Sequence, residues 1–166
     1  MPNWCESIIH VYGPNERLKE VLDLVKSDDL TFDFNKIIPR PAIYKNTASG
    51  FKDFEIPCAT STVTLTSWHE GDDGKARPFT EAEHEELSGH GAFNWYDWSI
   101  RNWNTKWNAC HVDEPVHDEA GEALRFQFDT AWEPPIPVIE ELRNRFPDLE
   151  IIAFYRDETE NTYTDY

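Results

Sequence analysis

The sequence has little of what several large classes of protein require. Its 166 residues include seven glycines, and its longest apolar runs have four or five residues. A membrane-spanning helix needs ~20 apolar residues. No charged segment followed by an apolar one resembles a secretory leader, so we expect neither a membrane span nor secretion. The few glycines leave little room for a phosphate-binding loop, and no GxSxG, Walker or HExxH motif is present.

Cysteines are equally scarce. Cys5, Cys58 and Cys110 are odd in number and have no CxxC spacing. This suits a reducing cytoplasm better than a disulfide framework. A metal site is not indicated either, because Cys110, His111 and His117 lack a spacing typical of zinc ligands. We therefore expect a cytoplasmic protein that uses no cofactor and no metal.

Positive charge is the third shortage. The chain has 15 Lys and Arg against 32 Asp and Glu, a formal net charge of −17. Aromatic residues make up 14%, including seven Trp, so the chain is expected to fold despite its charge. Direct binding to nucleic acid or to an anionic membrane is disfavoured. The charge either provides solubility alone, or imitates a phosphate backbone and binds a basic, nucleic-acid-binding partner.

The start of the chain predicts a β-α-β unit. Residues 7–12 contain the β-branched and aromatic side chains that favour a strand, and Gly13-Pro14 ends it. Apolar residues then recur at helical spacing over residues 18–25. Alternating Phe and polar residues over 31–38 favour a second strand. Residues 1–41 are thus predicted to form the first β-α-β half of a domain.

A second unit of this kind is predicted near the other end. Residues 124–129 alternate between apolar and polar, a helical pattern follows Pro137, and residues 151–155 form an apolar strand. Two such halves, 1–41 and 123–156, predict a single α+β domain with a ferredoxin-like, split β-α-β antiparallel sheet. Residues 157–166 form an acidic tail.

Between the two halves we expect a large, partly helical insertion, residues 42–122. Its expected parts are a loop at 42–60, a strand at 61–68, a helix that starts at a Thr80–Glu83 capping box, and a helix at 93–103.

Four motifs in this order resemble one family. They are MPNWC at the start, FNKIIP at 34–39, NWNTKWNA at 102–109 and FDTAWEPP at 128–135. The sequence resembles the YubB-like, Api-type group of phage and plasmid proteins, which have a ferredoxin-like domain. The resemblance implies that fold and a mobile-element origin in a bacterial host, but no established activity. One position departs from the pattern, since Asn104 stands where the resemblance implies a glycine.

Two groups of residues are candidates for a site. The first consists of uncompensated acidic residues that could contact a basic partner: Glu81, Glu83, Glu85, Glu86, Asp113, Glu114, Asp118 and Glu119. The second is aromatic and could stack on a nucleotide or other small ligand, or could simply belong to the core: Trp103, Lys106, Trp107 and Trp132.

The sequence predicts no catalytic residues, and we expect a non-enzymatic binding protein. Its expected role is to inhibit a host nucleic-acid-handling defence complex, of the anti-CRISPR or anti-restriction type, by DNA mimicry. The alternatives are a small-ligand binder or enzyme that uses the Trp103/Lys106/Trp107 region, and an accessory protein of the mobile element.

Overall fold

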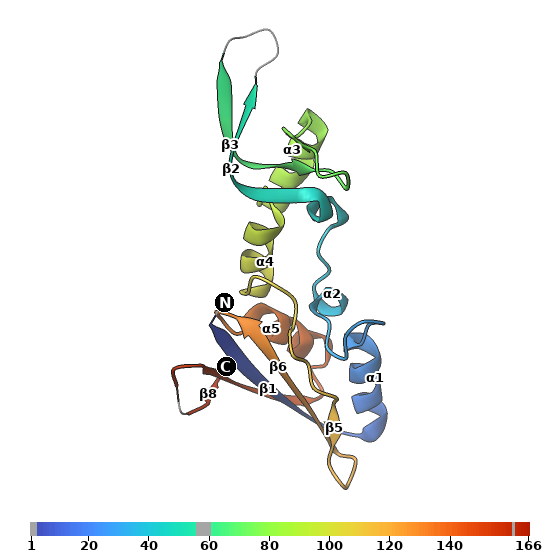
Figure 1. Cartoon of the computed structure of the whole chain (residues 1–166). Helices are drawn as coiled ribbons and strands as arrows, with labels where there is room; N and C mark the ends of the chain where they lie inside the picture. Colours follow the sequence, from blue (N-terminus) through green and yellow to red (C-terminus); the bar gives the residue numbers. More distant parts are fainter. Residues whose placement is uncertain (1–2, 56–60, 161) are drawn as a thin grey trace. The chain divides into compact units, whose positions relative to one another are not determined.

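The computed structural model describes residues 3–55, 61–160 and 162–166 (Figure 1). The chain divides into two compact units. One joins the two ends of the chain, Met1–Pro39 and Asn102–Tyr166, and the other is the continuous segment Arg40–Arg101. We call them the sheet unit and the inserted unit. The inserted unit is shorter than the insertion expected at 42–122, because residues 102–122 pack with the sheet unit.

The sheet unit contains a five-stranded sheet in the order β5-β6-β1-β7-β8. Central strand β1 is antiparallel to both neighbours, so that Ile8 lies opposite Gln127 on one side and Phe154 on the other. The strands are β1 (Trp4–Tyr12), β5 (Val116–His117), β6 (Ala123–Ala131), β7 (Glu150–Asp157) and β8 (Thr164–Asp165).

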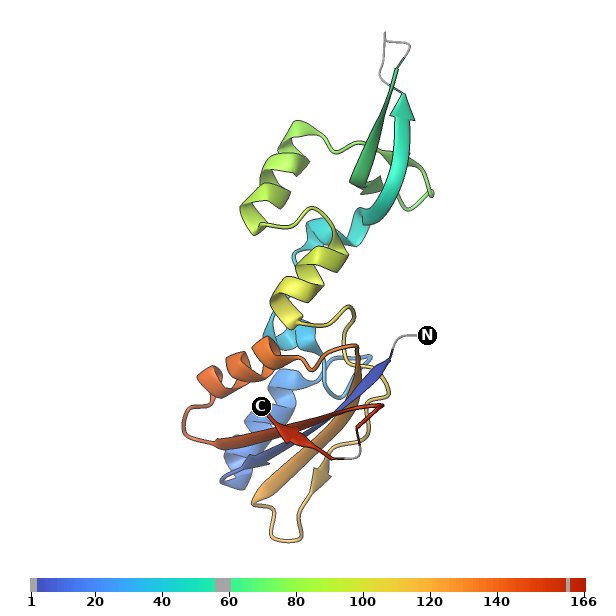
Figure 2. The ribbon, with the colours of Figure 1, turned by 90° about the vertical axis from the view of Figure 1, so that its left-hand side faces the viewer.

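Helices α1 (Asn15–Val25) and α5 (Ile136–Arg145) cover one face of this sheet (Figure 2). Alternate residues of β1 and β6, among them Ile9 and Phe126, are fully buried beneath them. The helices contribute buried aliphatic side chains at helical spacing, such as Leu18 and Leu142. Burial of this apolar face holds the unit together. No helix among the described residues is both long and apolar enough to span a membrane.

The expected α+β, ferredoxin-like fold is confirmed. Strands β6 and β7 run parallel to each other on either side of β1, and α5 connects them, which is a split β-α-β arrangement. The strand predicted at 31–38 is wrong, because this segment contains the short helix α2 (Phe34–Ile37). Asp33 caps it by accepting from the Asn35 amide. Phe32 and Phe34 are both buried in the core. Their alternation with polar residues led to the incorrect prediction of a strand.

Residues 157–166 were expected to form a tail, but Asp157 ends β7 and Thr164–Asp165 form the edge strand β8. Strand β8 pairs with β7, and the Tyr166 amide donates to the Ala153 carbonyl at 3.0 Å. Arg143 of α5 donates to the Tyr166 carbonyl at 2.6 Å. The acidic composition of this segment therefore does not prevent it from pairing as an edge strand.

The inserted unit has a three-stranded antiparallel sheet, β2-β3-β4, and two helices. The predicted strand at 61–68 and both predicted helices are present, and the Thr80–Glu83 capping box is confirmed. The loop expected at 42–60 is wrong over residues 42–55, and 56–60 lie outside the described residues. The elements are 3-10 helix η1 (Ala42–Asn46), β2 (Thr47–Glu55), β3 (Thr62–Glu70), β4 (Ala76–Arg77), α3 (Glu81–His90) and α4 (Trp95–Trp103).

Candidate functional site

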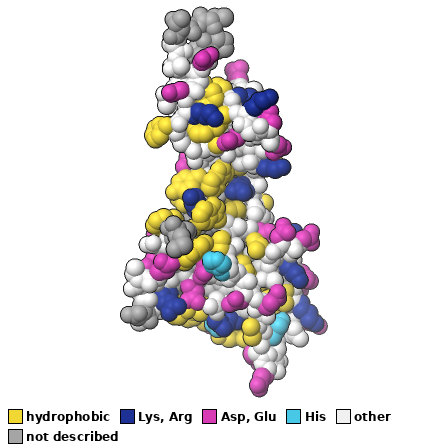
Figure 3. All heavy atoms as spheres, viewed as in Figure 1, with side chains coloured by type: hydrophobic (Ala, Val, Ile, Leu, Met, Phe, Trp, Pro, Cys, Tyr) yellow, Lys and Arg dark blue, Asp and Glu magenta, His cyan; other side chains and the backbone are white. Residues whose placement is uncertain are grey.

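The negative charge is concentrated in the sheet unit. The inserted unit, Arg40–Arg101, has six Lys and Arg and ten Asp and Glu, a net charge of −4. The remainder of the chain has nine and 22, a net charge of −13. Figure 3 shows acidic side chains spread over the visible surface of the sheet unit. A search for an acidic interface therefore begins there.

The β5–β6 hairpin, defined as residues 113–123, has an acidic surface. Asp113, Glu114, Glu119 and Glu122 are all exposed, and none of them forms an ion pair with a described residue. Asp118 is different, because its carboxylate accepts from the amides of Glu122 at 2.8 Å and of residue 123 at 3.0 Å. These backbone hydrogen bonds lower the pKa of Asp118 and stabilise the turn. Of the four residues predicted here, Asp113, Glu114 and Glu119 are available to a partner, and Asp118 shapes the turn.

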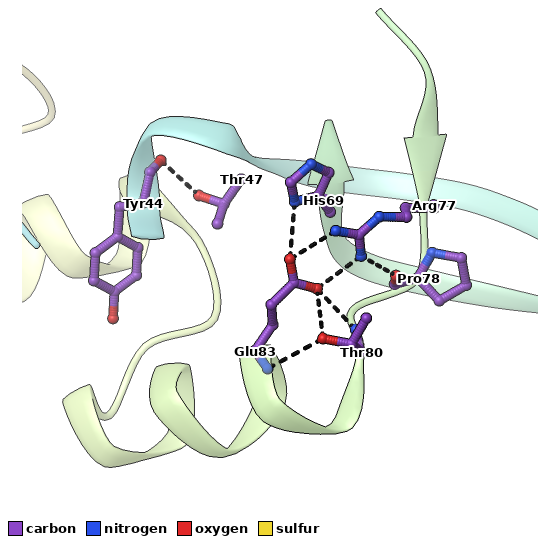
Figure 4. A network of polar contacts seen from close by, with 7 residues as sticks. All are labelled: Tyr44, Thr47, His69, Arg77, Pro78, Thr80 and Glu83. Carbon is purple, nitrogen blue, oxygen red and sulfur yellow. Dashed lines mark hydrogen bonds and ion pairs between the residues drawn. The ribbon is translucent and has the colours of Figure 1, made fainter. Parts of the chain in front are cut away.

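Helix α3 carries the other four predicted acidic residues. Glu83 is engaged inside the unit, where its carboxylate accepts from Arg77 at 2.7 Å, from the Thr80 amide at 2.8 Å, and lies 3.2 Å from His69 Nδ1 (Figure 4). The hydrogen bonds from Arg77, together with those from Thr80, lower its pKa to about 2. Glu81, Glu85 and Glu86 are exposed.

The members of the predicted aromatic group differ in their exposure. Trp103 is 1% exposed, and its indole Nε1 donates to the Ile38 carbonyl at 3.0 Å, so this side chain belongs to the core. Lys106 Nζ lies 4.5 Å from the ring centre of Trp107, which is about one-third exposed. Trp132 is half exposed and has a positive φ of 76°. A stacking site that includes Trp103 is therefore ruled out by its burial.

The backbone conformation at Asn104 accounts for the glycine that the resemblance implies at this position. Its φ is 62°, in the left-handed region that glycine adopts at little cost and asparagine tolerates. Its side-chain amide donates to the Pro134 carbonyl at 2.9 Å. The turn therefore keeps its geometry with asparagine.

The sheet face not covered by helices carries a polar network that sequence analysis missed. On β1, Glu6 accepts hydrogen bonds from Gln127 at 2.6 Å, Arg156 at 2.5 Å and Tyr163 at 2.6 Å. Partial burial alone would raise the pKa of Glu6, but the hydrogen bonds from Tyr163 and Arg156 bring it below its ordinary value. The donors come from three separate segments, so the sequence gives no local signal for this network.

Beside this network lies a shallow depression of about 480 Å³. Trp4 forms one wall, with its ring 4.7 Å from that of His111. His111 Nδ1 lies 2.8 Å from Asp129. Arg156 is the single cation in the lining. The other charged groups there are carboxylates, from Glu6, Asp129, Asp157, Glu158 and Glu160. The depression is therefore suited to a basic group.

The described cysteines do not have the properties of nucleophiles. Burial raises the pKa of the Cys5 thiol to about 12 and also raises that of Cys110. A catalytic cysteine needs a lowered thiol pKa. Cys58 lies outside the described residues. Within the part of the chain that the structure describes, no three His, Cys, Asp or Glu side chains are grouped so that they could hold a metal ion.

Comparisons with known proteins agree with the fold. Residues 102–164 match the family described as the ferredoxin-like domain in Api92-like protein. The crystal structure of protein Api92 from Yersinia pseudotuberculosis is similar over 100% of this chain and 94% of that chain, with a TM-score of 0.53 and 12% sequence identity. At this identity the likeness shows the fold alone. No curated protein matches the sequence. The resemblance to Api-type proteins is thus supported for the ferredoxin-like domain.

Proposed function

We propose that this protein is a non-enzymatic binding protein whose acidic sheet unit binds a basic surface of a partner protein. The observation that carries the proposal is the net charge of −13 on a unit with only nine Lys and Arg. Several of those cations are already engaged: Arg17 pairs with Asp148, Arg145 with Glu141, and Arg156 with Glu6. They are therefore poorly placed to neutralise the exposed hairpin.

The proposed contact surface is the β5–β6 hairpin. Its exposed carboxylates flank the short antiparallel pairing of β5 with β6: Asp113 and Glu114 precede β5, and Glu119 and Glu122 lie in the turn to β6. The turn geometry fixed by Asp118 holds the hairpin in shape before binding. Negative charges on a preorganised hairpin attract a basic surface at long range and lose little conformational freedom when bound.

The partner that this surface suits best is one that normally binds nucleic acid. A groove lined with Lys and Arg recognises a row of phosphates, and a row of carboxylates competes for the same cations. We propose that the natural target is a host defence complex of the CRISPR or restriction type, and that the protein comes from a phage or plasmid. The exposed residues Glu81, Glu85 and Glu86 of the inserted unit are proposed as additional contacts.

The proposal is tested by affinity capture from bacterial lysate at two salt concentrations. Raising the salt from ~0.1 M to ~0.5 M shortens the screening length from ~10 Å to ~4–5 Å, so a partner held by charge should be released. Added duplex DNA should also release it, because both ligands use the same basic surface. A partner that remains bound in both conditions would contradict charge mimicry.

A matched pair of variants locates the surface. In the first, Asp113, Glu114, Glu119 and Glu122 are changed to Lys, and we expect capture to be lost. In the control, four exposed acidic residues elsewhere in the sheet unit receive the same change: Glu16, Asp23, Asp28 and Asp29. In both variants the net charge rises by eight, because four negative charges are removed and four positive charges are added. Equal loss of capture in the two variants would show that net charge, and not the hairpin, is responsible.

A further inference from the structure

The inserted unit contains a separate pocket of about 380 Å³. Its walls come from β3, from α3 and α4, and from the loops that precede these two helices. Leu65, Pro78, Phe79 and Phe93 make much of the lining apolar. The loop that carries Phe79 is held in place, because Arg77 donates to the Pro78 carbonyl at 3.0 Å (Figure 4). Mostly apolar pockets of this size with a few polar groups are the usual form of small-ligand sites.

One carboxylate in this pocket is fixed in position by a buried amide. Asn94 is 2% exposed, and its Nδ2 donates to Asp97 Oδ2 at 2.7 Å and to Ser67 Oγ at 2.9 Å. Its Oδ1 accepts from the Asp97 amide at 2.9 Å, which fixes the first turn of α4. Two of the polar groups that line the pocket, those of Ser67 and Asp97, are therefore held by the same side chain. Such preorganisation lowers the entropy lost on binding a ligand.

The charge of Asp97 is not neutralised by the protein. Among the residues that the structure describes, none forms an ion pair with Asp97 and no Lys or Arg lines the pocket. The rings of His84 and Phe93 also line the pocket. Their centroids are 4.8 Å apart and their planes are tilted by 40°. Aromatic faces attract cations through their quadrupole, and a carboxylate adds a full negative charge. An anionic ligand would instead meet repulsion from Asp97.

We propose that this pocket binds an organic cation with a flat or apolar body, of the guanidinium or alkylammonium class. The cationic head would pair with Asp97, while Phe79 and Phe93 would contact its body. This site is independent of the proposed function, because it lies in the inserted unit and uses none of the acidic hairpin residues. The cation could be a free small molecule or an arginine side chain of a protein, and both share the same chemistry.

The test titrates two matched probes into the full-length protein and follows amide chemical shifts by NMR. The first probe is N-acetyl-arginine amide, and the second is N-acetyl-citrulline amide, which has nearly the same shape but no charge. We expect saturable binding of the arginine probe, with shifts at residues 65–67 and 93–97, and at least tenfold weaker binding of citrulline. Butylguanidinium, which has the same single charge but lacks the peptide groups, separates the two sources. Tighter binding of butylguanidinium favours a small molecule, and tighter binding of the arginine probe favours a protein side chain.

Three variants locate the site. Asp97→Asn keeps the hydrogen bond with Asn94 and should lower the affinity about tenfold, while Phe93→Leu keeps an apolar side chain and should lower it several-fold. Asp72→Asn, on an exposed loop of the same unit, removes the same charge outside the pocket and should have no effect. Absence of saturable binding in the unaltered protein would overturn the proposal. Equal binding of citrulline, or equal effects of Asp97→Asn and Asp72→Asn, would also do so.

Discussion

Neutralising Glu83 should destabilise the inserted unit far more than neutralising another acidic residue on the same helix. In Glu83→Gln the shape of the side chain is kept while its charge is removed. The variant weakens the bidentate pair with Arg77 and the hydrogen bond to the Thr80 amide. Glu85 is the matched control, because it is exposed on the same helix and forms no ion pair with a described residue.

The size of the effect follows from two independent estimates. A pKa lowered from 4.5 to about 2 corresponds to at most about 3 kcal/mol. Water reaches the pair, since the side chains of Glu83 and Arg77 are 23% and 44% exposed, so about half of this is expected. Adding ~1 kcal/mol for the cap and ~0.5 kcal/mol for an exposed ion pair gives a similar ~1.5 kcal/mol. For Glu85→Gln we expect no more than ~0.5 kcal/mol.

The pH dependence gives a second check. Because the pKa of Glu83 is lower in the folded protein, its stabilising effect is present above pH ~4.5 and is lost as the pH falls toward 2. The difference between Glu83→Gln and the unaltered protein should therefore shrink over that range. Urea titration followed by NMR signals of α3 measures the local stability of this unit. Equal stability of the two Gln variants at pH 7, or a difference that persists at pH 2, would refute the reasoning.

Three further predictions concern the sheet unit. Trp103→Ala should lose ~3–5 kcal/mol in urea unfolding because it empties a core position, whereas Trp107→Ala should lose less than ~1 kcal/mol. Cys5, whose thiol pKa is raised to about 12, should react with a disulfide reagent at pH 8 only when the protein unfolds; rapid labelling of Cys5 itself in the folded protein, located by peptide mapping, would contradict its burial. Asp118→Ala should broaden the NMR signals of the β5–β6 turn, and Asp118→Asn should do so less, since its carbonyl still accepts from the turn amides.

Sequence patterns predicted the elements that bury one clear face. Strands β1 and β6 alternate because every second residue enters the core, and α1 repeats its apolar residues at helical spacing. Strand β2 could not be predicted in this way, since Thr47 is its only buried residue. The opposite error occurred at Phe32 and Phe34, which alternate as in a strand but enter the core from a bend and from the first residue of α2, respectively.

The candidate site was less predictable than the fold. Exposed acidic residues can be found by composition, but their hydrogen-bonding partners cannot. Glu6 illustrates this, because its three partners lie 121, 150 and 157 residues away in the chain. The pocket around Asp97 likewise combines residues from β3, α3 and α4 that no motif connects. Long-range contacts of this kind require the tertiary structure.

The two acidic groups predicted from the sequence should therefore behave differently. Helix α3 is polar on nearly every side and buries only Leu87, so its ends contribute much of its stability. Acidic residues in its first turn, Glu81 and Glu83, interact favourably with the helix dipole, and Gly91 caps the other end with a φ of 73°. The negative charge of Glu81 and Glu83 therefore has a structural role, which is to stabilise the start of α3. The carboxylates of the hairpin residues other than Asp118 have no such role, since these side chains are exposed and accept no hydrogen bond from a described residue. Charge reversal of Glu83 should consequently reduce the stability of α3, whereas charge reversal in the hairpin should reduce partner binding.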